Sequence, residues 1–409
     1  MQCIVAHNKA MRPFPQKELS RFLSQGVRDV IPKNEVEAML QGTKALRVKY
    51  GIDPTTGELH LGYWAVFRRL KKLQALGHTA VVVLGTFTGR FGDPTGKMQA
   101  RSVREKRDVE KSARLLAQGV RKLLMPSRTK IVRNADWWDA MPLDAFFRIA
   151  ANFTTAQLGE RDLFEARKRL GKELFVYEFL YPVLQAYDSV AIGADLTIIG
   201  SDQLFNELQA RKLQHGMGGR PQGIIALTIL PGTDGKEKMS QSLGNTIGIF
   251  DPPEEQFGAL MSVPDGAMPL YAELLSDFSG ASIAHALRKG GLLARDAKMN
   301  LAENIVSEIH GKVAAAKAKE QFIKRFQKRE LPTDIADIAV RSKNIIPVLV
   351  ETKLASSNSV ARRLLRQRGV KLNNTIVINK NTAVGSGSIL SVGKRRIVRI
   401  LRKGVGNMG

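Results

Sequence analysis

The chain has 409 residues, of which 44% are hydrophobic, and it carries a formal net charge of +25. This size predicts two or three domains, each with enough apolar side chains for a core. A single cysteine, Cys3, excludes an internal disulfide framework and a cysteine-rich zinc site, and six scattered histidines predict no histidine metal site.

The first elements in chain order are predicted to be a strand, a helix and a strand. Residues 45–52 predict a strand that ends at a Gly-Ile-Asp-Pro break. Leu61 to Leu76 has the apolar periodicity of a helix, and Gly77 follows as a stop signal. The apolar run Ala80 to Leu84 predicts a buried parallel strand. This order is typical of a βαβ unit.

Two further apolar runs, 196–200 and 224–230, predict buried strands, with a helix from Leu204 to Gln214 between them. We therefore assign residues 1–235 to a doubly wound, Rossmann-like α/β domain. Ligands of such a fold bind at the carboxyl ends of the strands.

The pattern changes after Pro252-Pro253. Residues 250–330 predict a helical domain, 331–344 a linker, and 345–409 a small α+β domain. Within the last part we expect a basic helix from Ser359 to Arg368 and short strands, which fall at 375–378 and 396–401.

The last part of the chain is strongly basic. From Thr352 to Gly409 there are 13 Lys and Arg residues and no Asp or Glu, yet apolar residues recur at regular intervals. This pattern favours a folded domain that contacts a polyanion, and nucleic acid is the expected partner. The alternative is a solvated surface or one that binds an acidic protein.

No apolar run approaches the ~20 residues that span a bilayer, so no membrane partner is expected. The N-terminal segment 1–16 has no signal-peptide core and few of the Arg and Ser residues of a transit peptide. We expect a protein of a reducing, soluble compartment, which is the cytoplasm or, if the chain is already processed, an organelle matrix.

His60-Leu61-Gly62 falls at a predicted strand-to-helix junction. There the helix N-terminus offers free N–H groups to an anion, a histidine can donate to a phosphate, and Gly62 lets a nucleotide approach the backbone. By itself the tripeptide is a weak signal, and a chance match or a structural turn is the favoured interpretation. The segment 91–97 is not a phosphate loop, because position 91 is Phe and position 98 is Met.

Two more segments carry chemistry. The basic segment 236–245 follows Gly232-Thr233-Asp234-Gly235. A mobile loop of this kind can close on a triphosphate, although a solvated charge run is the alternative. Tyr181, Gln185 and Asp188 are spaced to lie on one helix face and are predicted to line a common pocket. An internal hydrogen-bond network is the alternative for these three side chains.

Six motifs occur in the order Gly-Ile-Asp-Pro-Thr, His-Leu-Gly, Gly-Asp-Pro-Thr-Gly-Lys, Leu-Gln-Ala-Tyr-Asp-Ser-Val, Gly-Ser-Asp-Gln and Lys-Met-Ser-Gln-Ser-Leu-Gly-Asn. In this order and spacing they resemble bacterial tyrosyl-tRNA synthetases, which belong to class I of the aminoacyl-tRNA synthetases, and most closely the branch with Tyr-Asp-Ser-Val. The likeness extends from about Phe22 to Arg402. The tail from Ser357 to Val370 resembles the S-four-type RNA-binding module that ends such enzymes.

The resemblance implies a reaction in two steps. The tyrosine carboxylate attacks the α-phosphate of ATP, which enters with Mg²⁺, and tyrosyl-adenylate then esterifies the terminal adenosine of tRNA(Tyr). It also implies a homodimer, and contact with the anticodon through the helical and C-terminal domains.

The resemblance further implies roles for residues at matching positions. The tyrosine hydroxyl would bind Asp188, and the ammonium group would bind Asp93, Tyr181 and Gln185, with Gln203 nearby. The ATP-binding residues would be Gly51, Asp53, His60, Gly62, Lys238 and Gln241. The catalytic residues would be His60, Lys238, Gln241 and Ser242. The RNA-binding residues would be Arg362, Arg363, Arg366, Arg368 and Lys371.

Four positions depart from the family pattern. Tyr63 stands where the HIGH motif has its second histidine, and Gln241 where the KMSKS motif has its second lysine. Loss of one such donor to the transition state typically costs ~10²–10³ in rate. Lys49 stands where many relatives have a tyrosine that shares the substrate phenol, and whether the adjacent Tyr50 substitutes for it stays open. Ile199 replaces the first glycine of the Gly-Gly-Ser-Asp-Gln pattern.

Two hypotheses follow. The first is an active tyrosine–tRNA ligase with an altered ATP site, supported by the complete set of tyrosine-pocket residues. The alternative is a synthetase-derived RNA-binding protein that no longer activates tyrosine and is structural in a ribonucleoprotein. An unrelated nucleotidylyltransferase would not explain the basic C-terminal module.

Overall fold

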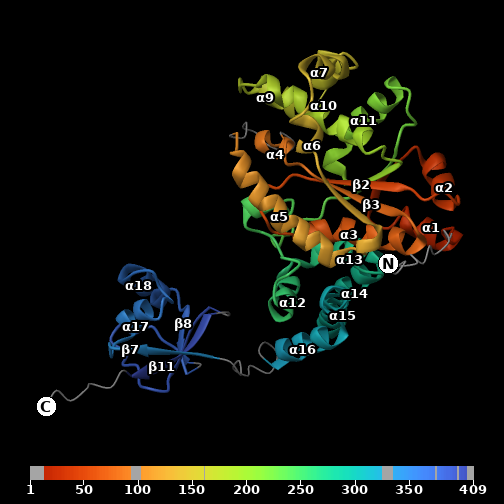
Figure 1. The fold of residues 1–409 in the computed structure, drawn as a ribbon. Helices are drawn as coiled ribbons and strands as arrows, with labels where there is room; N and C mark the ends of the chain where they lie inside the picture. Colours follow the sequence, from red (N-terminus) through yellow and green to blue (C-terminus); the bar gives the residue numbers. More distant parts are fainter. Residues whose placement is uncertain are drawn as a thin grey trace, which may run out of the picture. The chain divides into compact units, whose positions relative to one another are not determined.

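The structure, a computed structural model, describes residues 13–93, 103–160, 162–324, 335–373, 375–393 and 396–402 (Figure 1). The chain forms two compact units, Met1–Lys319 and Glu320–Gly409. Among the described residues no helix combines the length and the apolar character that crossing a bilayer requires.

The first unit is built on a six-stranded sheet in the order β1-β6-β5-β2-β3-β4. Every neighbouring pair is parallel except β1 with β6. The strands are β1 Val27–Ile31, β2 Arg47–Ile52, β3 Thr79–Leu84, β4 Thr129–Arg133, β5 Leu196–Gly200 and β6 Gly223–Leu227. The strand order reverses between β2 and β5, so a ligand crevice is expected at their carboxyl ends. The predicted doubly wound α/β fold is confirmed.

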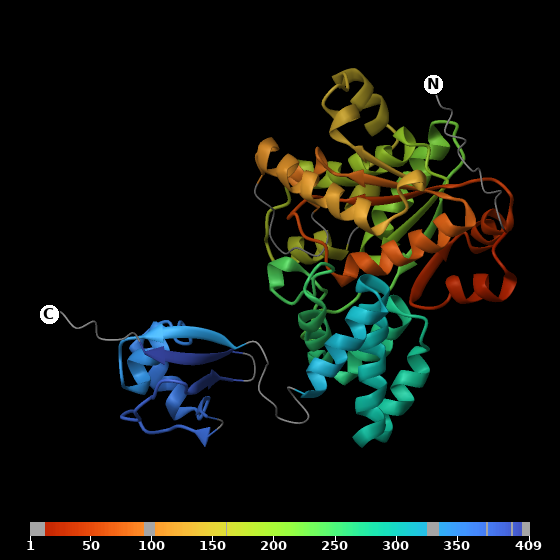
Figure 2. The same cartoon turned by 60° about the horizontal axis from the view of Figure 1, so that its bottom comes forward.

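Helices cover both faces of this sheet (Figures 1 and 2). α3 (Leu61–Leu76) and α5 (Lys106–Leu123) lie on one face, and α10 (Val176–Ala191) and α11 (Leu204–Gly216) on the other. The shorter elements before and between them are α1 Gln16–Phe22, α2 Lys33–Gln41, α4 Thr88–Phe91, α6 Ala135–Trp138, α7 Leu143–Ala150, α8 Thr155–Gly159 and α9 Asp162–Arg169.

The boundaries of α3 follow from its sequence. His60 caps its N-terminus by accepting a hydrogen bond from the backbone N–H of Gly62, and Gly77 ends it in the left-handed conformation at φ 113°. The predicted span, Leu61 to Leu76, is confirmed. The predicted strand 224–230 is too long, because β6 ends at Leu227 and Pro231 belongs to a separate bridge with Lys238.

Five helices follow the sheet: α12 Pro253–Ser262, α13 Met268–Leu275, α14 Gly280–Lys289, α15 Gly291–His310 and α16 Lys312–Phe322. The change to helices predicted after Pro253 is therefore observed. These helices up to Lys319 belong to the same compact unit as the sheet. One link is the ion pair between Arg68 of α3 and Glu308 of α15, at 2.6 Å between Nε and Oε2.

The second unit has a five-stranded sheet in the order β7-β11-β10-β8-β9. Its elements are β7 Ala336–Val340, α17 Ile345–Glu351, α18 Asn358–Arg366, β8 Val370–Leu372, β9 Thr375–Ile376, β10 Ile389–Val392 and β11 Arg396–Arg402. A separate apolar core, which includes Val348, Leu365 and Leu390, holds this unit together.

The sequence prediction of the second unit needs corrections. The predicted linker 331–344 contains β7, which pairs in parallel with β11, so the sheet begins before residue 345. β7 is an edge strand in which only Val340 is fully buried, and its apolar signal is correspondingly weak. The basic helix ends at Arg366, two residues earlier than predicted. The linker signal at 331–333 lies outside the described residues.

Candidate active site

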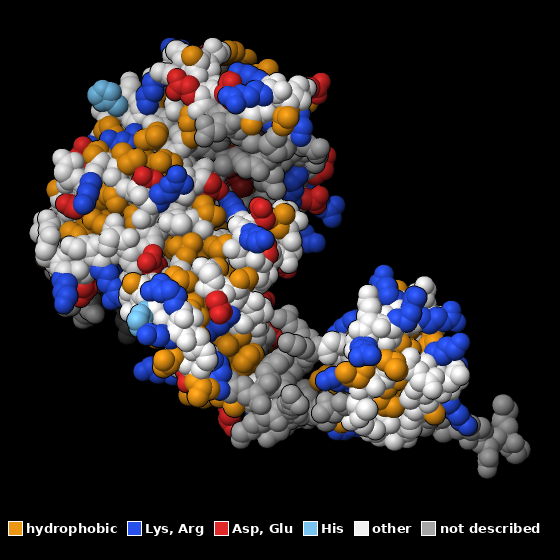
Figure 3. Space-filling model, turned by 180° about the vertical axis from the view of Figure 1, so that it is seen from behind, with side chains coloured by type: hydrophobic (Ala, Val, Ile, Leu, Met, Phe, Trp, Pro, Cys, Tyr) orange, Lys and Arg blue, Asp and Glu red, His pale blue; other side chains and the backbone are white. Residues whose placement is uncertain are grey.

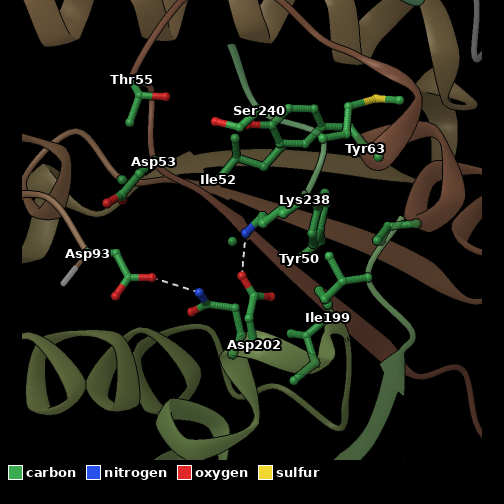
Figure 4. Close-up of a pocket in the computed structure, with 18 of the residues that line it drawn as sticks. Tyr50, Ile52, Asp53, Thr55, Tyr63, Asp93, Ile199, Asp202, Lys238 and Ser240 are labelled. Carbon is green, nitrogen blue, oxygen red and sulfur yellow. Dashed lines mark hydrogen bonds and ion pairs between the residues drawn. The ribbon is translucent and has the colours of Figure 1, made fainter. Parts of the chain in front are cut away.

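A cavity of about 920 Å³ opens at the carboxyl ends of β2 and β5, where the strand order reverses (Figure 4). Its walls come from β2, the start of α3, one face of α10, the segment 199–203 and the loop 238–242. It is lined by all residues predicted to bind tyrosine or ATP or to act in catalysis: Gly51, Asp53, His60, Gly62, Asp93, Tyr181, Gln185, Asp188, Gln203, Lys238, Gln241 and Ser242. The structure thus brings these side chains together, while their roles stay predictions.

Asp188 is buried at one wall of this cavity and is surrounded by hydrogen-bond donors. Its Oδ1 accepts from the indole nitrogens of Trp137 at 3.0 Å and Trp138 at 3.1 Å. Its Oδ2 accepts from the amide of Asn134 at 3.2 Å. Burial raises the pKa of Asp188 to about 7, while the charge of Lys49 and these donors act in the opposite direction. The carboxylate is therefore a buried acceptor held in one orientation.

Asn134, Trp137 and Trp138 were not predicted to belong to the site. They follow β4 directly, at the same edge of the sheet as the cavity. Polar and aromatic residues directly after a strand are a signal of a ligand site. This signal could not be used here, because β4 has only two strongly apolar residues and was not predicted as a strand.

The other polar residues of the wall are joined by hydrogen bonds in two groups. Tyr181 donates to Asp53 Oδ2 at 2.8 Å. Asn206 donates to the carbonyl oxygens of Gln185 at 2.8 Å and Gln203 at 3.1 Å. Gln203 in turn donates to Asp93 Oδ2 at 2.7 Å. The common pocket and the internal hydrogen-bond network, which the sequence left as alternatives, are both present.

His60 is neutral at pH 7 and can donate a hydrogen bond from Nε2. Its Nδ1 accepts the backbone N–H of Gly62 at 3.2 Å, so the neutral ring carries its proton on Nε2. Burial and the charge of Lys238 lower the pKa of His60 to about 4, so the ring is uncharged at pH 7. A Cβ on residue 62 would lie 2.9 Å from the His60 ring, so glycine preserves this cap. At Gly51 a Cβ would meet no protein atom, which leaves that part of the cavity open.

The loop 238–242 reaches residues across the cavity. Lys238 forms an ion pair with Asp202. Gln241 donates to Glu58 Oε2 at 3.1 Å, and its carbonyl oxygen accepts from the hydroxyl of Thr56. These contacts argue against a merely solvated charge run. Ser242 lies at the rim, 2.9 Å from the hydroxyl of Ser240.

Comparison with known proteins identifies the family of the chain. The family model described as tRNA synthetases class I (W and Y) matches residues 41–327. The tyrosine–tRNA ligase of Thermotoga maritima is 41% identical over 390 residues, which cover 94% of this chain and 97% of that protein. The chain belongs to the class I tyrosyl-tRNA synthetases. The tyrosine–tRNA ligase of Moorella thermoacetica is 38% identical over 391 residues, or 93% of this chain and 95% of that protein.

Solved structures of tyrosyl-tRNA synthetases share the fold. A C-terminally truncated mitochondrial enzyme from Aspergillus nidulans superimposes with a TM-score of 0.61 at 21% identity, covering 75% of this chain and 92% of that one. The Archaeoglobus fulgidus enzyme, solved with L-tyrosine, gives a TM-score of 0.58 at 23% identity over 74% of this chain and 99% of that one. Nothing in these comparisons favours the alternative of a protein that has lost the synthetase function.

The structure places the residues at which the sequence is predicted to depart from the family pattern. Tyr63 packs on His60, with 4.5 Å between ring centroids. Lys49 and Tyr50 point to opposite faces of β2, Lys49 toward α10 and α11 and Tyr50 edge-on to Phe67 of α3. Tyr50 is therefore not on the face that carries Asp188. Ile199 is buried and lines the cavity.

The predicted RNA-binding residues of this synthetase are in the second unit, apart from the cavity in the sequence. Arg362, Arg363 and Arg366 are exposed on α18, opposite the buried Ala361 and Leu365. Two further exposed cations, Arg368 and Lys371, follow on the turn and on β8. Figure 3 shows Lys and Arg side chains around the visible face of this unit.

Proposed function

We propose that the chain is a tyrosine–tRNA ligase of the cytoplasm or an organelle matrix, which activates tyrosine with MgATP and transfers it to tRNA(Tyr). The observation that carries this proposal is the buried Asp188, which three donors hold in place at the cavity wall. A carboxylate has about four acceptor sites, and these three donors leave one of them for a further donor from the cavity. The phenol hydroxyl is the part of tyrosine that can supply this donor.

The other polar residues of the cavity wall are suited to bind the ammonium group of tyrosine. An ammonium group needs acceptors, and the carboxylate of Asp93 and the carbonyl oxygen of Gln185 supply them, with Tyr181 and Gln203 beside them. The tyrosine carboxylate would then face the part of the cavity where His60 and the loop meet. There Nε2–H of His60 and the charge of Lys238 would stabilise the phosphates, and Gln241 and Ser242 would donate hydrogen bonds to the leaving pyrophosphate.

The altered ATP motifs are tested by tyrosine-dependent ATP–pyrophosphate exchange. We expect exchange in the parent protein, and a rate that rises about 10-fold or more in a Tyr63→His, Gln241→Lys double variant, because two neutral donors become groups that can carry charge. Asp188→Ala is the control that should abolish exchange. Exchange absent in the parent but gained in the double variant would instead identify a protein that no longer activates tyrosine.

The basic surface of α18 is proposed to contact tRNA. Replacing Arg362, Arg363 and Arg366 together with alanine should weaken tRNA binding and reduce the slope of log K against log salt by about 1 for each phosphate that is no longer neutralised. Filter binding at several salt concentrations measures both. The matched triple lysine variant keeps the charge and should retain most of the affinity. Equal binding by the alanine variant would show that tRNA lies elsewhere.

A homodimer is proposed from apolar side chains that the first unit leaves exposed. Leu143 and Phe147, on one side of α7, are 71% and 63% exposed. Val176, the first residue of α10, is 76% exposed. Large exposed apolar side chains one helical turn apart, such as Leu143 and Phe147, are typical of interaction sites. Sedimentation equilibrium tests the proposal, and a monomer at micromolar concentration would contradict it.

A further inference from the structure

Lys49 and Glu207 form an ion pair beneath the tyrosine side of the cavity. The two side chains are each 1% exposed, and Lys49 Nζ lies 3.0 Å from Glu207 Oε1 and 3.1 Å from Oε2. A buried pair of this kind contributes little net stability, because desolvation offsets the attraction. Neither residue carries a predicted role in binding or catalysis, so the pair calls for another explanation.

The pair contacts α10 on both sides of Asp188. Lys49 Nζ lies 2.6 Å from the hydroxyl of Ser189, the residue next to Asp188. Glu207 Oε1 accepts from the amide of Gln185 at 2.7 Å, one turn earlier on the helix. The face of α10 that lines the cavity is thus tied to β2 and α11 through these two charges.

Glu207 also fixes which way the neighbouring amides point. Its two oxygens accept from Gln185 and, at 2.6 Å, from Gln222. With its nitrogen bound to Glu207, Gln185 must turn its oxygen toward Asn206, which donates to it. Asn206 then orients Gln203, and the chain of donors ends on the carboxylate of Asp93 at the cavity.

We propose that Lys49 and Glu207 are positioning residues for tyrosine recognition. Glu207 orients the amides that meet the ammonium group, and Lys49 provides a positive charge that favours the ionised form of Asp188 for the phenol. This inference rests on the proposed tyrosine activation and adds two residues to it that act through others.

The electrostatic surroundings of Asp188 make the proposal testable by pH. The charge of Lys49 on β2 acts on Asp188, and Glu207 of α11 is the ion-pair partner of Lys49. The phenol of Tyr181, on the same helix as Asp188, also interacts with Asp188 electrostatically. The neutral donors Asn134, Trp137 and Trp138 complete its environment. Removal of the cation should raise the pKa of Asp188, and removal of the Glu207 anion should lower it.

The experiment is the pH profile of kcat/KM for tyrosine in ATP–pyrophosphate exchange, which reports the free enzyme. Lys49→Met should move the acid limb to higher pH by about one pH unit, and Glu207→Gln should move it to lower pH. The double variant should return it close to the parent. KM for ATP should change by less than about 3-fold in each variant, because both residues act on the tyrosine side. Opposite shifts are a signature that a loss of packing alone would not produce.

Controls separate the possible failures. Lys44→Met removes an ion pair with Asp195 near the other end of β2, in which the lysine is mostly exposed, and should leave the acid limb of the pH profile unchanged. If Lys49→Met does not fold, two variants still test the proposal. Glu207→Gln should move the acid limb to lower pH, and the double variant should have an acid limb close to that of the parent. Shifts of the same sign, or none, in variants that still activate tyrosine would overturn the positioning role. No tyrosine-dependent exchange in the parent would overturn the proposed function, and this inference with it.

Discussion

Replacing Asp188 with asparagine is expected to lower kcat/KM for tyrosine by at least about 100-fold. Truncation or neutralisation of one partner in a buried, charged hydrogen bond costs about 2–5 kcal/mol. In addition, the new amide would place its own N–H₂ group against Asn134 or the two indoles, which are all donors. The measurement is tyrosine-dependent ATP–pyrophosphate exchange at saturating ATP.

The same variant should lose discrimination against phenylalanine. Phenylalanine has no hydroxyl to lose, so its kcat/KM should change far less than that of tyrosine. Asp195→Asn is a control, because Asp195 is a carboxylate of the same unit that binds Lys44 and Arg47 away from the cavity. If Asp188→Asn keeps both its activity and its preference for tyrosine, Asp188 is not the partner of the phenol.

Glu178→Ala is expected to lower the free energy of unfolding of the first unit by about 3–5 kcal/mol, because removal of one partner leaves the guanidinium of Arg167 buried without its counter-charge. Glu178 and Arg167 form a bidentate pair at 2.6 and 3.1 Å, with side chains 1% and 2% exposed. Glu178 also accepts the backbone N–H of Phe175 at the start of α10, at 2.9 Å, and this bond would be broken too.

Urea unfolding followed by circular dichroism measures this loss. The matched control is Glu165→Ala on α9, which removes an ion pair with Lys168 whose two side chains are about half exposed. An exposed pair of this kind contributes about 0–1 kcal/mol, so the control should stay close to the parent. Equal small losses of stability in both variants would show that, in Glu178→Ala, water or another group replaces the Glu178 carboxylate as the partner of Arg167.

The elements that could be predicted from the sequence are those whose signals are local. α3 carries a cap and a glycine stop at its two ends, β3 and β5 consist mostly of apolar residues, and β2 ends at the Gly-Ile-Asp-Pro break. β7 was missed because it is an edge strand in which only Val340 is fully buried, so its apolar signal is weak. The carboxyl ends of parallel strands meet at one edge, which is why motifs far apart in the chain could be expected in one cavity.

The pair of Lys49 and Glu207 has no local signal in the sequence. Lys49 and Glu207 are 158 positions apart, and no spacing rule connects a lysine on a strand with a glutamate on a later helix. From the sequence, Lys49 was a departure from the family pattern and nothing more. Glu207 could be recognised as its partner only in the structure, where Lys49 of β2 contacts Glu207 of α11.

The opposite orientation of adjacent side chains on β2 has a consequence for chimeric enzymes. Exchange of the segment up to β4 with that of a relative that has tyrosine at position 49 would separate Lys49 from Glu207, which comes from the other half. The hybrid would keep every family motif intact and still contain a lone carboxylate in its interior. Functional hybrids should therefore be those in which positions 49 and 207 have the same parent, whereas Tyr50, one residue away, can be inherited independently of residue 207.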